Sequence, residues 1–241
     1  MKLILSVVTI LFLVGCTEKK SPESSNGIDT PVMPPTQLNA AFLIVDGVYN
    51  SELIAPMDVL HHTIFHSEKG IKVFTVAPVN DTITSFEGLK IIPDYSFLTD
   101  TLPRIDILVV PSAKNSMSSD LENKELLEFV QKTGKQASYI MSLCDGAFVL
   151  AKAGLLDTYE CTTFPGDIDK FKKAFPALKV HEGISFVHDR KAITSAGGAK
   201  SYDPALYLVE LLYGKPAAEG IGKGLVIDWK LSEVKSIRTH H

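Results

Sequence analysis

The chain has 241 residues, of which 45% are hydrophobic, and a formal net charge of −4. This length and apolar content suit one globular domain with a sizeable core, and the small, mixed charge argues against a nucleic-acid partner. Three cysteines are too few for a disulfide scaffold. The composition therefore excludes a disulfide-rich module and indicates an ordinary folded domain.

The N-terminus is predicted to be a lipoprotein signal peptide over residues 1–15. Lys2 precedes a run of apolar and small residues that is too short to cross a bilayer as a helix. The run ends in Leu-Val-Gly-Cys at 13–16, which resembles the lipobox of bacterial lipoproteins. That resemblance implies cleavage before Cys16 and its acylation. An ordinary cleaved signal and a buried N-terminal helix are the alternatives.

Residues 16–38 are predicted to be the lipid-anchor cysteine and a flexible tether. The segment is rich in Glu, Lys, Ser, Pro and Thr and cannot bury a core. We therefore expect an extracytoplasmic domain held at a membrane through Cys16, on the periplasmic side or at the outer membrane of a Gram-negative cell. Thr17 stands where an Asp is the usual inner-membrane retention signal, which mildly favours the outer membrane.

In the remaining chain, short apolar runs alternate with longer stretches whose apolar residues recur with the period of a helix. Short β-rich runs predict buried strands, and amphipathic stretches between turn residues predict helices. The expected strands are 40–45, 71–77, a pair within 82–93, 106–110, 137–143, 161–164 and two or three within 180–194; the expected helices are 52–66, 120 or 123 to 133 with Gly134 as the stop, 144–154, 166–175, 201–213 and, as helix or loop, 216–224. Such alternation predicts an α/β fold with a mostly parallel sheet flanked by helices on both faces, over 39–225, followed by a C-terminal extension over 226–241.

Cys144 stands where the strand 137–143 turns into a helix. A strand that turns sharply into a helix holds its corner residue in a strained, exposed pose, which is the nucleophile elbow. The helix N-terminus favours an anion there, so we expect the thiol to lose its proton more easily than a free cysteine. Gly146 supplies the small volume that the corner needs. A buried structural cysteine is the competing interpretation.

Other side chains offer weaker alternatives. Cys144 and Cys161 remain after Cys16 and could form a disulfide, which would block the nucleophile. His62 and His66 have a spacing that could bind a metal, although a solvated helix face explains them as well. In open α/β sheets ligands bind at the carboxyl ends of the strands. The loops 46–52, 111–116 and 144–146 are therefore expected to converge there.

Several motifs together resemble the ThiJ/PfpI superfamily, which includes the Parkinson-disease-associated deglycase and isonitrile hydratases. They are the elbow Leu-Cys-Asp-Gly-Ala-Phe-Val-Leu-Ala at 143–151, the helix start Ser-Glu-Leu-Ile-Ala-Pro at 51–56, and Ile-Thr-Ser-Ala-Gly-Gly at 193–198. The resemblance covers about residues 40–225, with the motifs in the family order. It implies the flavodoxin-like fold of class I glutamine amidotransferases.

The resemblance also assigns site residues. Cys144 would be the nucleophile and Glu52 its acidic partner, which is expected to be protonated or to share a proton with the sulfur. The oxyanion donors would be the backbone N–H groups of Asp145 and, in the loop after the proline, of Ala113. A small-molecule substrate is expected, with no cofactor and no metal. The superfamily commonly forms dimers, so a homodimer is possible.

The chain departs from the family pattern in three places. Many members have Gly-Gly where this chain has Ser112 and Ala113. The added side chains leave less room for a substrate to approach the backbone N–H that would be the second oxyanion donor. The hydratase-like branch has Thr-Thr-His where this chain has Thr-Thr-Phe at 162–164, so Phe164 replaces the histidine. The protease-named branch has His directly after the nucleophile, where this chain has Asp145. His181 and His188 remain as possible substitutes, with surface loop histidines as the simpler interpretation.

These residues predict a cysteine-dependent enzyme that acts on a small electrophile, of hydratase, lyase or hydrolase type. Peptide hydrolysis is not expected, because it needs a proton donor for the leaving amine and no Cys-His pair is present. The alternative is a redox-responsive or ligand-binding lipoprotein without turnover, since a low-pKa cysteine is also readily oxidised. A degenerate member kept as a binding or scaffold domain is a third possibility.

Overall fold

The computed structural model of the protein describes residue 34 and residues 36–239. Its centre is an eight-stranded sheet with the order β12-β10-β11-β7-β6-β1-β2-β5. The strands are β1 (Asn39–Leu43), β2 (Lys72–Ala77), β5 (Tyr95–Ser96), β6 (Ile107–Val110), β7 (Tyr139–Leu143), β10 (Phe186–Asp189), β11 (Ala192–Ser195) and β12 (Ser236–Thr239). The strands from β11 to β5 pair in parallel, and β10 runs antiparallel to β11.

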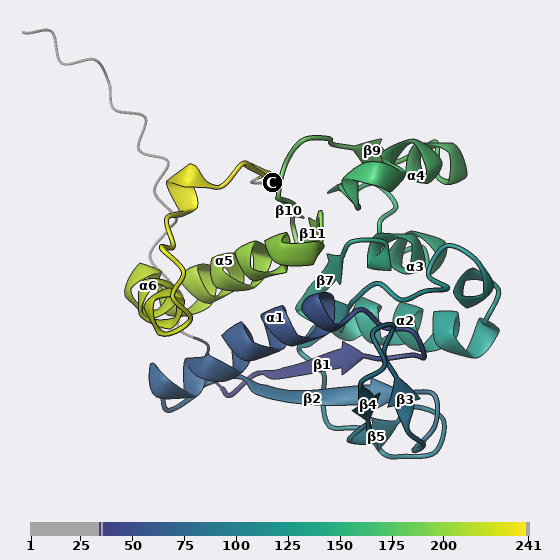
Figure 1. The fold of residues 1–241 in the computed structure, drawn as a ribbon, viewed down its shortest axis with the longest axis horizontal. Coiled ribbons are helices and arrows are strands. Elements are labelled where there is room, and N and C mark those ends of the chain that lie inside the picture. The colour runs from purple at the N-terminus through teal and green to yellow at the C-terminus, as the bar shows by residue number, and fades with distance from the viewer. Residues whose placement is uncertain (1–33, 35, 240–241) are drawn as a thin grey trace, which may run out of the picture.

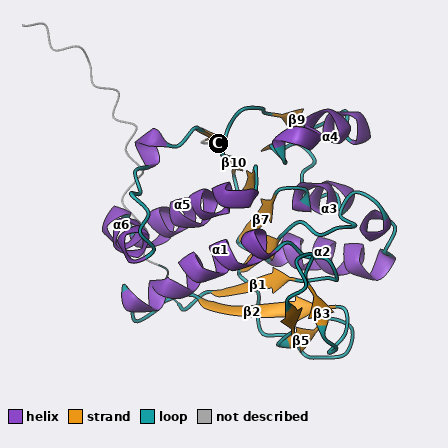
Figure 2. Ribbon diagram, in the orientation of Figure 1, coloured by secondary structure: helices purple, strands orange, loops and turns teal. Residues whose placement is uncertain are grey.

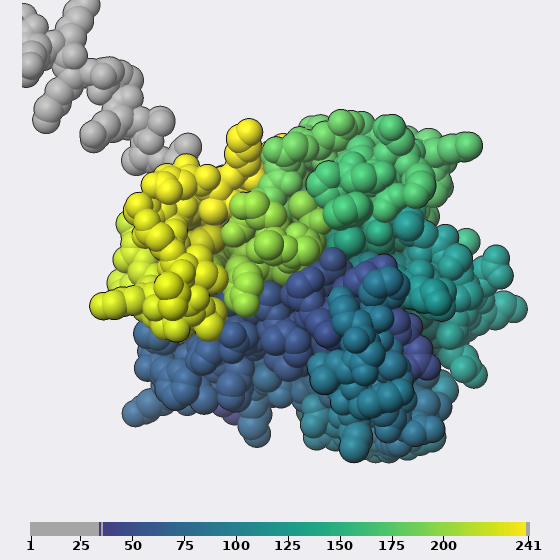
Figure 3. Space-filling model, viewed as in Figure 1, coloured from purple at the N-terminus to yellow at the C-terminus, as the bar shows by residue number. Residues whose placement is uncertain are grey.

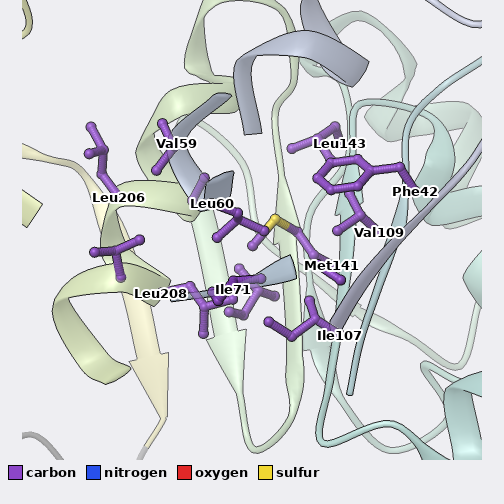
Figure 4. Packing of buried hydrophobic residues seen from close by; sticks show 14 of the residues in the cluster. Phe42, Val59, Leu60, Ile71, Ile107, Val109, Met141, Leu143, Leu206 and Leu208 are labelled. Carbon is purple, nitrogen blue, oxygen red and sulfur yellow. The ribbon is translucent and has the colours of Figure 1, made fainter. Parts of the chain in front are cut away.

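Helices cover both faces of this sheet (Figures 1 and 2). One face carries α1 (Asn50–His61), α5 (Tyr202–Tyr213) and α6 (Lys215–Gly224), and the other carries α2 (Lys124–Gln136), α3 (Gly146–Lys152) and α4 (Ile168–Ala174). Neighbouring residues of a strand enter different cores: Phe42 packs with the first group of helices and Ala41 with the second. Figure 4 shows Leu60 of α1 beside Met141 of β7 in the first core. The predicted α/β class is confirmed.

Two short sheets lie outside the main one. A hairpin is formed by β3 (Ile83–Thr84) and β4 (Lys90–Ile91), and β8 (Glu160–Cys161) pairs in parallel with β9 (Lys179–Val180). The expected strand at 161–164 is therefore only its first residue. Thr162 and Thr163 continue as buried loop because their hydrogen bonds go to His181, Thr194 and the elbow instead of a ladder.

The C-terminal segment completes the main sheet. Residues 236–239, expected within an extension, form β12 and pair in parallel with β10. Trp229 is buried and donates from Nε1 to Glu210 of α5 at 2.6 Å. The space-filling view shows the C-terminal residues in yellow as a continuous part of the surface (Figure 3). Within the described residues, every helix is too short or too polar to span a bilayer.

Candidate active site

Cys144 lies at the sharp turn between β7 and α3, with a φ of 53°. This left-handed conformation is strained for a residue with a side chain, and it persists only where its surroundings hold it. The N–H of Cys144 donates to Ser195 O at 3.0 Å, and its carbonyl accepts from Thr163 Oγ1 at 3.0 Å. The predicted elbow is therefore present and is held from both sides.

Two glycines make room for the elbow. A Cβ on Gly146 would lie 2.0 Å from the carbonyl oxygen of Val110, and a Cβ on Gly197 would lie 2.3 Å from the Cβ of Cys144. Gly197 also has a φ of 76°, which favours glycine. The sequence pointed to Gly146; Gly197 was noted only as part of a family motif. The available signal was a glycine pair, Gly197 and Gly198, that begins two residues after the end of β11.

The loops expected to converge do so around this cysteine. Tyr49 N–H donates to Ser112 O at 3.1 Å and Lys114 N–H donates to Gly47 O at 2.9 Å, which joins the first loop to the second. A fourth loop, 196–198, completes the site. It brings the N–H of Gly198 within 3.2 Å of Glu52 Oε1.

Glu52 lies in the first turn of α1 and is 4% exposed. Its Oε2 is buried and has no well-formed hydrogen bond within the described part of the chain, although the Cys144 thiol and the Ser112 N–H approach the carboxyl. Burial raises the pKa of Glu52, and the hydrogen bonding from Gly198 and Cys144 only partly offsets it. This direction agrees with the expectation that Glu52 carries or shares a proton.

The pKa of the Cys144 thiol shifts in the direction opposite to the expected one. Burial, followed by the charges of Glu52 and Asp145, raises the pKa of Cys144 well above its usual range, where we expected the helix N-terminus to lower it. The helix α3 has only 7 residues, and the desolvation and the two carboxyls outweigh its dipole. Because these acids interact, a proton on Glu52 makes the thiolate easier to form. Proton transfer from the sulfur to the carboxylate is therefore the accessible route to a nucleophile.

The two expected oxyanion donors are in different states. The N–H of Asp145 is directed at the Cys144 sulfur. The N–H of Ala113 donates to Ser116 Oγ at 2.8 Å and is buried. Ala113 would therefore reach an oxyanion only after the Ser116 hydroxyl turned away, so Asp145 is the donor that the structure presents.

Side chains that the sequence reasoning did not assign also face the elbow. Thr163 Oγ1 lies 3.1 Å from Asp145 Oδ1, and the Asp145 carboxyl contacts Asp167. Tyr49 is half-buried and contacts Phe86 with ring centroids 4.6 Å apart and ring planes tilted by 35°. Its raised pKa reflects first its burial and then the charge of Cys144. These contacts join residues far apart in the chain, so no local pattern could have found them.

The remaining candidates lie elsewhere. His181 Nε2 pairs with Glu160 Oε2 at 2.6 Å, and His188 Nδ1 bonds the hydroxyl of Tyr207 at 2.7 Å. The register places His188 two strands from β7, beside residues that precede the elbow. Both Cys144 and Cys161 are free thiols, so they do not form the disulfide that was left open. The predicted lipidation site, Cys16, lies outside the described residues.

Comparisons with known proteins agree with this geometry. The DJ-1/PfpI family matches residues 39–211. The transcriptional regulator GbdR of Pseudomonas aeruginosa is 26% identical over 202 residues, which cover 82% of this chain and 54% of GbdR. The chain thus spans about half the length of that relative. An isonitrile hydratase of Pseudomonas putida is 29% identical over 182 residues, covering 76% of this chain and 75% of the hydratase.

A solved structure shows the same architecture. The crystal structure of Drosophila melanogaster DJ-1beta matches with a TM-score of 0.69 at 22% sequence identity, covering 80% of this chain and 100% of that one. At this identity the likeness shows the fold alone. The family match spans more than half of the 241 residues and includes the elbow and the Glu52 helix. The chain belongs to the DJ-1/PfpI family.

Proposed function

We propose that this protein is a cysteine-dependent enzyme that acts on a small electrophilic substrate by addition chemistry of hydratase, lyase or hydrolase type. The observation that carries the proposal is the pairing of Cys144, strained at φ 53°, with the buried carboxyl of Glu52. A nucleophile beside a group that can take its proton is the basic requirement of covalent catalysis. The similarity to an isonitrile hydratase supports this class of reaction.

Each residue has a defined task in the proposed step. The Cys144 thiol gives its proton to Glu52 Oε2, which has no well-formed hydrogen bond to any of the residues that the structure describes. With an isonitrile, the sulfur attacks the terminal carbon and that carbon takes the proton from Glu52, so that a C–S bond forms and a thioimidate, R–N=CH–S, results. Water then adds across the C=N bond, its hydroxyl to the carbon and its proton to the nitrogen, while the Asp145 N–H stabilises the developing negative charge. The C–S bond breaks as the hydroxyl becomes a carbonyl, which releases an N-substituted formamide and returns the hydroxyl proton to the sulfur.

Substitution of the two residues tests the proposal. We expect Cys144→Ala to abolish turnover on a panel of isonitriles, 2-oxoaldehydes and activated amides. Glu52→Gln is expected to lower kcat roughly 10²- to 10⁴-fold, the usual contribution of general acid–base catalysis. Glu122→Gln, an exposed carboxylate outside the site, is the matched control. Unchanged turnover in Cys144→Ala would remove the mechanism.

A non-catalytic role is the second candidate, and two observations favour it. Cys144 is only 7% exposed and its pKa is raised, both of which slow a nucleophile. The chain also resembles a transcriptional regulator, GbdR, over most of its length. We infer that such a protein would bind a ligand or respond to oxidants without turnover. Selective oxidation of Cys144 after mild peroxide treatment, detected by mass spectrometry, together with inactivity on the whole panel, would favour this role.

We propose that Cys16 anchors the domain to a membrane outside the cytoplasm. The lipobox-like ending of the apolar run supports this placement. The wild-type protein should appear in the membrane fraction with a lipid-modified N-terminal peptide, and Cys16→Ser should appear in the soluble fraction. A wild-type protein found only in the soluble fraction would contradict the anchor.

A further inference from the structure

The residue after the nucleophile carries a carboxyl that the steps above do not use. Asp145 occupies the N-cap of α3, yet its side chain makes no capping hydrogen bond. The side chain turns instead toward Thr163 and Asp167, and the residue is 7% exposed. A buried carboxyl with two polar neighbours beside a nucleophile must have a definite protonation state.

A count of hydrogens indicates that state. Thr163 Oγ1 lies 3.0 Å from the Cys144 carbonyl and 3.1 Å from Asp145 Oδ1, but a hydroxyl has one hydrogen to donate. The hydroxyl can therefore donate to the Cys144 carbonyl or to an ionised Asp145, but not to both. The contact between the Asp145 and Asp167 carboxyls needs one proton, because two carboxylates repel. When Asp145 carries that proton and donates it to Asp167, the Thr163 hydroxyl can donate to the Cys144 carbonyl.

The charges around the pair place that proton on Asp145. Lys170 of α4 bonds Asp167 Oδ1 at 2.5 Å, so the positive charge of the ammonium lies on the Asp167 side of the carboxyl pair. The other titratable groups that act on Asp145 or are acted on by it are Glu52 of α1, Cys144 and Tyr49.

The pKa values of the same groups agree. Burial, followed by the charge of Asp167, raises the pKa of Asp145 to about 7. The charge of Asp145 in turn raises the pKa of Cys144.

We propose that Asp145 is a positioning residue for Cys144, and that the proton held between the Asp145 and Asp167 carboxyls controls how readily the thiol ionises. In its neutral form Asp145 bonds Asp167 and leaves the Thr163 hydroxyl to hold the elbow carbonyl, while the thiol ionises without a charged neighbour. In its anionic form it repels the thiolate. The proposal rests on the proposed function only for the identity of Cys144 as the reacting group.

The test follows the rate of Cys144 alkylation by iodoacetamide from about pH 5.5 to 9, quantified by mass spectrometry of the Cys144 peptide. The readout is the ratio of the rate in Asp145→Asn to that in the wild type. At low pH both residues are neutral and the ratio should be near one. Above neutral pH the wild type gains a charge, and the ratio should rise about tenfold, for a change of about one unit in the thiol pKa. The midpoint of the rise should lie near 7, the pKa of Asp145.

A second variant locates the cause. Asp167→Asn removes the charge that favours the proton on Asp145. In proteins that carry Asp167→Asn, the ratio of alkylation rates with and without Asp145→Asn should therefore have its midpoint at lower pH. Asp169→Asn, an exposed neighbour of Asp167, is the matched control and should leave the midpoint unchanged. A merely structural role for Asp145 would change the rate by the same factor at every pH. A ratio that does not vary with pH overturns the proposal.

The readout separates this inference from the proposed function. Alkylation reports the thiol and needs no substrate, so a ratio that titrates near 7 supports the role of Asp145 even if no turnover is found. Cys144-dependent turnover with a flat ratio would leave the enzyme proposal standing and remove this one. If Asp145→Asn fails to fold, the wild type and Asp167→Asn are compared directly. As Asp145 ionises, the wild-type alkylation rate should rise less steeply with pH. This less steep region should lie at lower pH in Asp167→Asn, and a region that does not move rejects the proposal.

Discussion

Gly197 lies so close to the nucleophile that no side chain fits between them. An added Cβ would meet the Cys144 Cβ at 2.3 Å and its backbone N at 2.7 Å. The same loop delivers the Gly198 N–H to Glu52. One glycine therefore sets the position of both partners in the proposed proton transfer.

Gly197→Ala should lower the free energy of unfolding and slow Cys144 alkylation. The backbone of Gly197, with φ 76° and ψ −163°, is essentially restricted to glycine and costs about 1–3 kcal/mol for a residue with a Cβ. The contact with Cys144 adds to that cost. Gly183→Ala is the matched control, because Gly183 has a φ of 68° and no atom of residues 34 and 36–239 lies within 4 Å of an added Cβ. Urea unfolding and alkylation rates measure both effects. Equal losses in the two variants would mean that the close contact is relieved at no cost.

Asp145 should make the protein less stable as pH rises. Its pKa is raised from 3.8 to about 7, so its neutral form stabilises the fold fully below about pH 4, and this contribution is lost as pH rises through 7. The difference corresponds to at most about 4 kcal/mol. Asp145→Asn should lack this loss, so its unfolding free energy relative to the wild type should increase from pH 5 to pH 8. A constant difference, measured by urea unfolding, would contradict the raised pKa.

At the level of the elements, α2 shows why local signals mislead. Gly134 was predicted to end the helix, but α2 continues to Gln136. An added Cβ on Gly134 would lie 2.3 Å from Leu155 Cδ1, so the glycine serves close packing instead of termination. The helix end is set by Lys191, whose Nζ donates to the carbonyls of Gly134, Lys135 and Ala137.

The same limit explains which parts of the site could be predicted. Strand and helix periodicity located the elbow and the Glu52 helix, because both depend on neighbouring residues in the chain. The occupied N–H of Ala113 and the carboxyl pair of Asp145 and Asp167 depend on tertiary contacts that leave no periodic pattern. Desolvation at the elbow is also a tertiary effect, and it reversed the expected direction for the pKa of Cys144.

The C-terminal segment is coupled to α5 through the bond from Trp229 to Glu210. Trp229→Phe keeps an aromatic side chain but replaces the indole with a smaller phenyl ring and removes the donor, which leaves a buried Glu210 oxygen unpaired. We expect a loss of about 1–3 kcal/mol in the free energy of unfolding. In the Glu210→Gln background the loss from Trp229→Phe should be smaller, because the neutral amide needs a donor less. Thermal or urea unfolding of the four proteins of this cycle measures the coupling, and additive losses would contradict it.

At the scale of the whole molecule, the domain reaches beyond the family match. The family covers residues 39–211, whereas β12 and buried Trp229 belong to the same fold. The β12 strand was missed because each of its residues is half-buried and the segment has no strong alternation. The predicted fold class and superfamily are both confirmed.

Truncation after Leu225 should therefore destabilise the protein. It removes the edge strand β12, exposes the backbone of β10 and uncovers the part of α5 that Trp229 buries. We expect a lower Tm and increased aggregation relative to the full chain. Light scattering during thermal unfolding measures both, and a truncated protein as stable and soluble as the full chain would show that the segment contributes nothing.

The strand that ends directly before Cys144, β7, lies inside the sheet with β6 on one side and β11 on the other. Its amides are therefore among the last that solvent deuterons can reach, because their exchange requires the sheet itself to open. The reactive cysteine is therefore held by the most stable part of the fold, and not by a less stable region that could unfold before the sheet. Heat or denaturant should then inactivate the protein in the same cooperative step that dissolves its core, without a folded but chemically silent intermediate.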